Sequence, residues 1–300
     1  MPVAVTRVCL ALAIVFVAIV AAPPRTIVAG TGVKVAIIVG PTGSLTDSYR
    51  QRANEVADAA LAAGATVTKA YSPRATWARV RDAVAGANVI VYFGHGNGYP
   101  NPYSTTEWRD RTNGWGLNRT TTNGDRDDWS KTLVYCGEKA LLGTLSSSDG
   151  AAQRQYCRGG ISPAPGFVMV YGQAHYAPGF GERYSPDDPL TTYEKARQRV
   201  RNYSFPILAL RGSAFFATAY GDADRIVARL LNQSDRTFGY IFRQGVGYNA
   251  NKLRSYAHPD RPGRIWIQKT VIDGFHFGDA DFWYAFAGRP SGTPRQAGLT

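Results

Sequence analysis

The chain of 300 residues is 44% hydrophobic and only 19% charged, and its formal net charge is +12. This composition is typical of a compact, loop-rich secreted protein, folded as one large domain or two small ones, rather than of a disordered or coiled-coil chain. The positive charge favours anionic surroundings such as cell-wall polymers or lipid headgroups. Nucleic acid is disfavoured, because the sequence has no zinc-finger spacing, recognition-helix signature or basic run with interleaved aromatic residues.

The N-terminus has the pattern of an export signal. Arg7 supplies a positive charge, residues 8–20 form an unbroken apolar run, and Ala21-Ala22-Pro23-Pro24 ends it. A membrane-spanning helix needs about 20 apolar residues, so this shorter run favours a signal peptide over residues 1–30, with an uncleaved anchor as the alternative. We therefore expect a secreted or cell-surface protein that has no stable membrane span once the signal is removed.

The next residues alternate between strand and helix patterns. Strands are expected at 33–40, 65–70 and 88–93, and helices at 44–63 and 76–87. This β-α-β-α-β order with short links predicts an α/β fold with a doubly wound, mostly parallel sheet and helices on both faces. The domain is expected to span residues 31–289.

Residues 99–165 interrupt this alternation and are expected to form an insertion. They are rich in polar and aromatic residues, show little amphipathic period, and contain Cys136 and Cys157. In an exported protein an even pair of cysteines predicts a disulfide, which would brace the insertion as a lid or wall over the carboxyl edge of the sheet. The alternative is that one of the two is a catalytic thiol.

The strand and helix patterns resume after the insertion. Strands are expected at 167–172 and 213–219, and helices at 191–210, 222–232 and from 237 to 243. In a C-terminal hairpin region, 246–289, residues 264–272 are expected to form an edge strand or hairpin arm, with a strand at 282–286 as its partner. Residues 290–300 are predicted to be a disordered tail.

Two of the expected strands end in histidine. The buried run at 88–93 leads directly into Gly94-His95-Gly96, and the strand at 167–172 leads to His175. Ligands of open α/β sheets bind at the carboxyl ends of the strands, and an imidazole placed there is a candidate general base. Neighbouring strands lie about 4.8 Å apart, so we expect His95 and His175 to meet across one cleft.

Four sequence blocks occur in a defined order along the chain. They are Gly94 to Gly98, Gly116-Leu117-Asn118, Tyr135-Cys136-Gly137-Glu138, and His175-Tyr176-Ala177-Pro178-Gly179. With these blocks the chain resembles a set of uncharacterised exported bacterial proteins and, more distantly, the caspase–gingipain group of cysteine peptidases. The resemblance covers roughly residues 33 to 245.

The resemblance implies a caspase-like sheet and a set of catalytic roles. His95 would be the base that activates a thiol, and the Gly96 N–H would be an oxyanion donor. The thiol should stand at the position of His175, where this sequence has no cysteine. An imidazole is a poor replacement for a thiolate as an acyl acceptor, so the chemistry of the family is expected to be altered.

Three hypotheses follow for the function. The favoured one is a non-proteolytic peptidase homologue that binds a peptide or a cell-wall polymer, with Asn97, Glu138 and Glu182 as candidate binding residues. The second is a metal-dependent hydrolase in which His95 and His175, with Glu138 or Glu182, hold zinc. The third is an active cysteine peptidase that uses Cys136 or Cys157. No cofactor can be named from the sequence.

An acidic cluster within the insertion is a weaker candidate site. Asp125, Asp127 and Asp128 follow Asn123-Gly124 and hint at a calcium loop. The later glutamate of an EF-hand is missing, so a solvated polar turn is the favoured interpretation.

Overall fold

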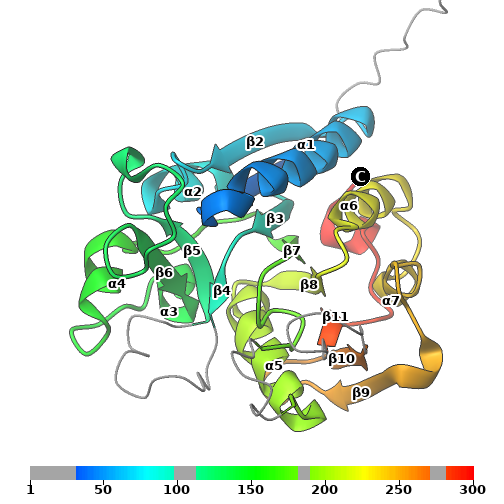
Figure 1. Ribbon diagram of the computed structural model, residues 1–300. Helices are drawn as coiled ribbons and strands as arrows, with labels where there is room; N and C mark the ends of the chain where they lie inside the picture. Colours follow the sequence, from blue (N-terminus) through cyan, green and yellow to red (C-terminus); the bar gives the residue numbers. More distant parts are fainter. Residues whose placement is uncertain (1–31, 98–112, 182–189, 271–281) are drawn as a thin grey trace, which may run out of the picture.

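The computed structural model describes residues 32–97, 113–181, 190–270 and 282–300. Their centre is one eight-stranded sheet in a mixed α/β fold (Figure 1). In spatial order its strands are β2 (Thr66–Tyr71), β1 (Lys34–Val39), β3 (Val89–Phe93), β7 (Gly166–Gly172), β8 (Gly212–Thr218), β11 (Phe282–Gly288), β10 (Arg264–Lys269) and β9 (Leu253–Ala257). The first five are parallel, and the last three continue the sheet antiparallel.

The parallel strands inside the sheet are the continuous apolar runs of the sequence, and all five residues of β3 are buried, whereas the edge strand β2 is mostly polar and partly exposed. Both faces of the internal strands are covered, which is why they read as unbroken rather than alternating patterns. β3 pairs with β1 on one side and with β7 on the other, with Val89 opposite Val35 and Val168. The strands that precede His95 and His175 are therefore neighbours, as expected.

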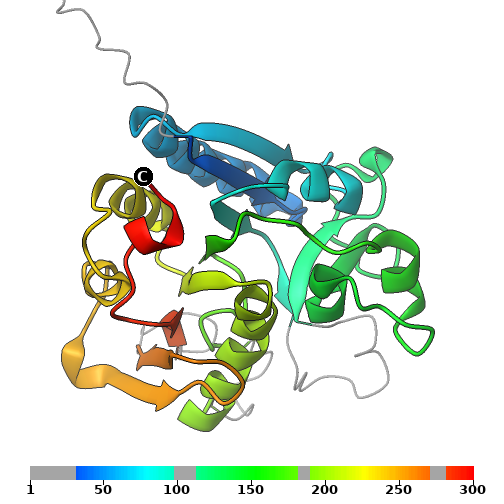
Figure 2. The same ribbon diagram turned by 180° about the vertical axis from the view of Figure 1, so that it is seen from behind.

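Helices cover both faces of the sheet, which confirms that part of the prediction (Figures 1 and 2). One face packs against α1 (Thr46–Ala62), α6 (Ala223–Asn232) and α7 (Phe238–Arg243). The other packs against α2 (Trp77–Val84) and α5 (Tyr193–Ala209). Within the described residues, no helix is long and apolar enough to cross a membrane.

The insertion is more regular than the sequence predicted. β4 (Gly96–Asn97), β5 (Gly114–Asn118) and β6 (Leu133–Gly137) form a second, three-stranded antiparallel sheet, followed by α3 (Glu138–Leu142) and α4 (Ala151–Tyr156). β5 is completely buried although two of its five residues are glycine. Glycine has no side chain that could contribute to a hydrophobic alternation, so the pattern of a buried strand was lost.

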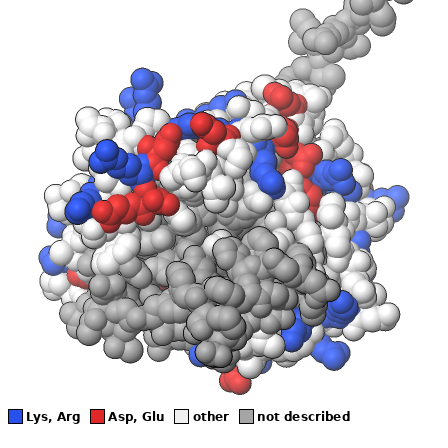
Figure 3. Space-filling view, in the orientation of Figure 1, with Lys and Arg blue, Asp and Glu red and all other residues white. Residues whose placement is uncertain are grey.

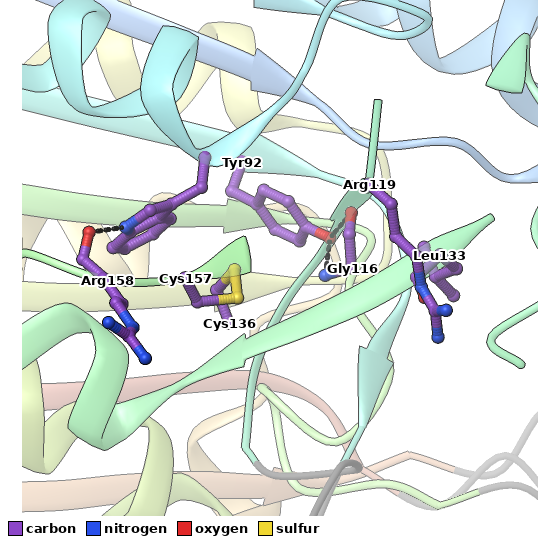
Figure 4. The surroundings of a disulfide bond; sticks show 8 residues. Tyr92, Gly116, Arg119, Leu133, Cys136, Cys157 and Arg158 are labelled. Carbon is purple, nitrogen blue, oxygen red and sulfur yellow. Dashed lines mark hydrogen bonds between the residues drawn. A yellow bond between two sulfur atoms is a disulfide. The ribbon is translucent and has the colours of Figure 1, made fainter. Parts of the chain in front are cut away.

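A disulfide braces this insertion, as predicted. Cys136 on β6 is bonded to Cys157, which follows α4, and both residues are completely buried (Figure 4). The bond ties the residue that follows α4 to the edge strand β6 of the three-stranded sheet.

The C-terminal region differs from the prediction in two respects. The expected pairing of 264–272 with 282–286 is present between β10 and β11, but β10 is not an edge strand, because β9 pairs with its outer side. The last residues, 290–300, are not a disordered tail. A short 3-10 turn, η4 (Arg295–Ala297), packs beside β7, Ala297 and Leu299 are buried, and Arg295 pairs with Asp235. The segment is mostly polar, so its sequence did not reveal that Ala297 and Leu299 make apolar contacts with the rest of the fold.

Candidate functional site

The sheet has a topological switch point between β1 and β3. From β1 the chain crosses to β2 on one side and then returns to β3 on the other, which gives the order β2-β1-β3. Crossover helices diverge at such a point, and ligands of doubly wound folds bind beside it at the carboxyl ends of the strands. The two turns that meet there are residues 40–44, after β1, and residues 94–97, after β3.

His95 lies at this switch point and pairs with a carboxylate from the insertion. Its Nε2 is 3.2 Å from Oδ2 of Asp127. Asp127 also lies against the turn after β1, because a Cβ on Gly43 would come within 3.1 Å of the same oxygen. The side chains of His95 and Asp127 are 29% and 46% exposed, so solvent and solutes reach the pair.

Neighbouring contacts hold the Asp127 loop on the sheet edge. The carbonyl oxygen of Asp125 accepts a hydrogen bond from the Gly43 N–H at 2.9 Å. The carboxylate of Asp125 accepts from Ser72 Oγ at 2.8 Å and from Arg50 at 2.5 Å. Residues 119–132 are thus fixed over the ends of β1 and β2, and this part of the insertion forms the wall that the sequence predicted.

The three aspartates of this loop do not converge on one point. Asp125 pairs with Arg50, Asp127 pairs with His95, and Asp128 accepts hydrogen bonds from Ser130. A calcium site needs several oxygens directed at one ion. These carboxylates have separate structural partners, so the hint of a calcium loop was wrong.

A buried aromatic network positions the backbone of His95. Tyr92 Oη donates to the His95 carbonyl at 2.7 Å. It also accepts from the Gly116 N–H at 2.8 Å, as Figure 4 shows. The Tyr92 ring stacks on Trp115, whose Nε1 donates to Tyr171 Oη at 2.8 Å. Burial raises the pKa of Tyr92 well above its usual value, so this hydroxyl stays protonated. The two sheets therefore hold the turn at His95 jointly.

The turn that carries His175 lies directly against the turn that carries His95. A Cβ on Gly96 would overlap the carbonyl oxygen of His175, so only glycine permits this approach. The imidazole of His175 packs against Phe180, with ring centroids 5.1 Å apart. The predicted proximity of the two strand ends is present in the backbone, whereas the side chain facing His95 Nε2 is Asp127.

The backbone around His175 adopts left-handed conformations that are unfavourable for residues with side chains. Gln173 and Tyr176 both have φ of 66°. Each such residue costs on the order of 1 kcal/mol and persists only where the surroundings impose it. Gln173 Oε1 is also buried without a hydrogen-bond partner among the described residues. The turn after β7 is therefore a strained element of the same edge.

The remaining predicted residues next to His95 are held inside the fold. Gly96 is buried in β4 opposite Trp115. Asn97 is also buried, and its carbonyl oxygen accepts a hydrogen bond from Tyr203 Oη at 2.6 Å. The binding role of Asn97 and the oxyanion role of Gly96 remain predictions, while Glu182 lies outside the described residues.

Glu138 is a largely buried carboxyl group rather than a surface one. It is the first residue of α3, and burial raises its pKa, against a smaller opposing effect of a hydrogen bond with Asn113. Its Oε2 has no hydrogen-bond partner in the described part of the chain.

The described structure does not bring together the residues of the metal-site alternative that included Glu138. In the described ranges, no group of three or more His, Cys, Asp and Glu side chains is arranged to hold a metal ion. His95, His175 and Glu138 therefore do not form a zinc site, and the variant of this hypothesis that uses Glu182 falls outside the described residues.

The alternative of a catalytic lid cysteine needs a free thiol, and the structure pairs the two cysteines instead. Cys136 and Cys157 are bonded to each other and completely buried. Neither can supply the thiolate that a cysteine peptidase requires. The partner that the structure gives to His95 is a carboxylate.

Asp127 is the functional candidate that the sequence concealed. It is separated from His95 by 32 residues, and it was grouped with Asp125 and Asp128 as a polar turn. The one feature of the sequence that could have identified Asp127 was its position in an insertion expected to cover the carboxyl edge of the sheet.

Comparisons with known proteins found no match to this chain. No protein-family model matches the chain, and neither the curated proteins nor the solved structures contain a significant match. Inferences about function therefore rest on the residues and their geometry.

Proposed function

We propose that this chain is an exported, non-proteolytic homologue of caspase-like peptidases that binds a peptide beside His95 and Asp127. The observation that carries the proposal is that Cys136 and Cys157 are bonded to each other. The side chain that pairs with His95 is the carboxylate of Asp127. A histidine and an aspartate without a thiol retain the means to bind polar groups but lack the acyl acceptor of the family.

The position of the pair also supports a binding role. Ligands of doubly wound folds approach the switch point between β1 and β3, where Asp127 and His95 are partly exposed. Next to them, the turns after β3 and β7 are held by close backbone contact and by the unfavourable conformations of Gln173 and Tyr176. A rigid edge with an accessible carboxylate favours recognition of a specific polar group over loose association.

Local charge indicates the kind of peptide. The chain as a whole carries +12, yet Asp and Glu side chains lie among Lys and Arg side chains across the upper part of the face in Figure 3, where α1 lies in Figure 1. Along this rim Asp47 and Asp125 both pair with Arg50, whereas the partner of the partly exposed Asp127 is His95, which carries a charge only when protonated. A cationic group, such as a lysine side chain or a free amine of the peptide, is complementary to this rim.

The test measures binding and cleavage with the same peptides. Fluorescence anisotropy would follow the purified protein with a labelled tripeptide that contains lysine and with its glutamate counterpart, and chromatography would check that the peptides stay intact. We expect the lysine peptide to bind better and to remain uncleaved. Asp127→Asn removes a charged acceptor worth about 1.5–3 kcal/mol, so binding should weaken at least about tenfold.

The matched control is Asp82→Asn, which makes the same charge change at an exposed position of α2. Cleavage that disappears in His95→Ala would overturn the non-proteolytic proposal. An equal effect of both aspartate variants would move the binding site away from Asp127. Sedimentation with insoluble peptidoglycan but no peptide binding would replace the peptide with a cell-wall polymer.

A further inference from the structure

A separate cavity lies at the opposite edge of the main sheet. It has a volume of about 460 Å³ and opens at the amino end of β8, between Gly212 and Ser213 and the last residue of β11, Gly288. The loop between β9 and β10 contributes Arg261, and the segment after β11 contributes Arg289. None of these elements takes part in the site around His95.

The charged residues that line this cavity are positive. Its lining contains two arginines and no aspartate or glutamate. The acidic residues next to it in the chain have other partners, since Asp260 binds Arg201 through both oxygens at 2.6 and 2.9 Å, and Asp235 binds Arg295 at 2.5 and 3.0 Å. Among the described residues no aspartate or glutamate lines the cavity; Asp260 is hydrogen-bonded to Arg201 and acts on Arg261 only through a smaller electrostatic interaction.

Both guanidinium groups have unused hydrogen-bonding capacity. Arg261 lies over the ring of Phe205, 5.1 Å from its centroid, and its Nε is buried without an acceptor among the described residues. Arg289 has no ion pair or side-chain hydrogen bond within that same part of the structure. A buried N–H that has lost water and gained no acceptor is unfavourable, and a bound anion would remove the penalty.

We propose that this cavity binds a small organic molecule through its phosphate group. A guanidinium group can bind two phosphate oxygens at once. The two positive charges of Arg261 and Arg289 match the two negative charges of a phosphate dianion. Ser213, Thr293 and Gln296 add neutral polar groups to the lining, and Leu208 and Phe238 add apolar surface. The volume exceeds that of an inorganic phosphate ion, and the apolar surface fits the organic part of a phosphomonoester.

The proposal is independent of the peptide-binding function, because the two sites lie at opposite ends of the parallel strands. Isothermal titration calorimetry at constant ionic strength would compare phenyl phosphate, inorganic phosphate and phenol. We expect phenyl phosphate to bind more tightly than inorganic phosphate, and phenol not to bind. Arg261→Gln and Arg289→Gln should each weaken phenyl phosphate binding at least about tenfold, because each removes a charged donor.

The matched control is Arg225→Gln, which removes the same charge from an exposed position of α6. It should leave the affinity unchanged. Thermal unfolding without ligand provides a second readout: an unpaired cation predicts that Arg261→Gln and Arg289→Gln keep or raise the melting temperature, whereas a structural arginine would lower it. No binding of phenyl phosphate at about 10 mM, or equal weakening by Arg225→Gln, would overturn the proposal.

Discussion

Removal of the disulfide tests how the insertion is stabilised. Cys136 and Cys157 are 21 residues apart in the sequence, and both are completely buried. In the chain-entropy model a crosslink of this length lowers the entropy of the unfolded chain enough to contribute about 3 kcal/mol at 25 °C. For a domain of this size, that loss corresponds to a decrease of roughly 6–12 °C in the melting temperature of the variant Cys136→Ala/Cys157→Ala.

Urea denaturation followed by circular dichroism would measure the free energy of unfolding for the double variant and for each single variant. Because the bond needs both sulfurs, each single replacement should cost nearly as much as the double one. The wild-type protein unfolded in the presence of reductant should approach the same value. A double variant that loses less than about 1 kcal/mol, or single effects that add up to the double effect, would refute the assignment of this stability to the crosslink.

Further predictions concern buried polar groups. Burial lowers the pKa of His258 below 6.5, so the unfolded chain binds a proton more readily. The free energy of unfolding should therefore be fully retained above pH 6.5 and fall between pH 6.5 and the lower folded pKa, and urea titrations should show a weaker fall in His258→Gln. Burial raises the pKa of Glu138, so its ionised form destabilises the fold above the ordinary pKa of 4.5; Glu138→Gln should raise the melting temperature at pH 7 and have little effect below pH 4.5. Tyr203→Phe removes the 2.6 Å hydrogen bond to the buried carbonyl of Asn97 and should cost about 1–3 kcal/mol, as measured by urea denaturation. Gly96→Ala forces a Cβ against the carbonyl oxygen of His175 and should lower the free energy of unfolding by about 1–3 kcal/mol. Gly86→Ala is the comparison: Gly86 has a left-handed conformation and open space around it, so this variant measures the cost of backbone conformation without a steric clash.

The parallel half of the fold was predictable from the sequence. The expected strands at 33–40 and 88–93 correspond to β1 (Lys34–Val39) and β3 (Val89–Phe93), and the expected helix at 44–63 corresponds to α1 with the short turn before it. These elements are continuous apolar runs or amphipathic stretches bounded by glycine, so their local pattern already encodes their burial.

The features that the local pattern did not encode depend on distant partners. β5 is buried because a second sheet surrounds it, not because its glycine-rich sequence is hydrophobic. Asp127 comes beside His95 only because the insertion folds back over the switch point. The final segment is ordered by two small contacts at Ala297 and Leu299, which no window of the sequence distinguishes from a polar tail.

The place of β11 in the sheet sets the order in which the chain can assemble. β11 is the last strand in the sequence, yet it lies between β8 and β10. The five parallel strands can pair once residue 218 has emerged, and β9 can pair with β10, but the two parts join only when residues 282–288 arrive. Until then β8, with its two buried phenylalanines, presents a bare strand edge that other chains can pair with. This long-range closure is the step at which folding should be slowest and misassembly most frequent.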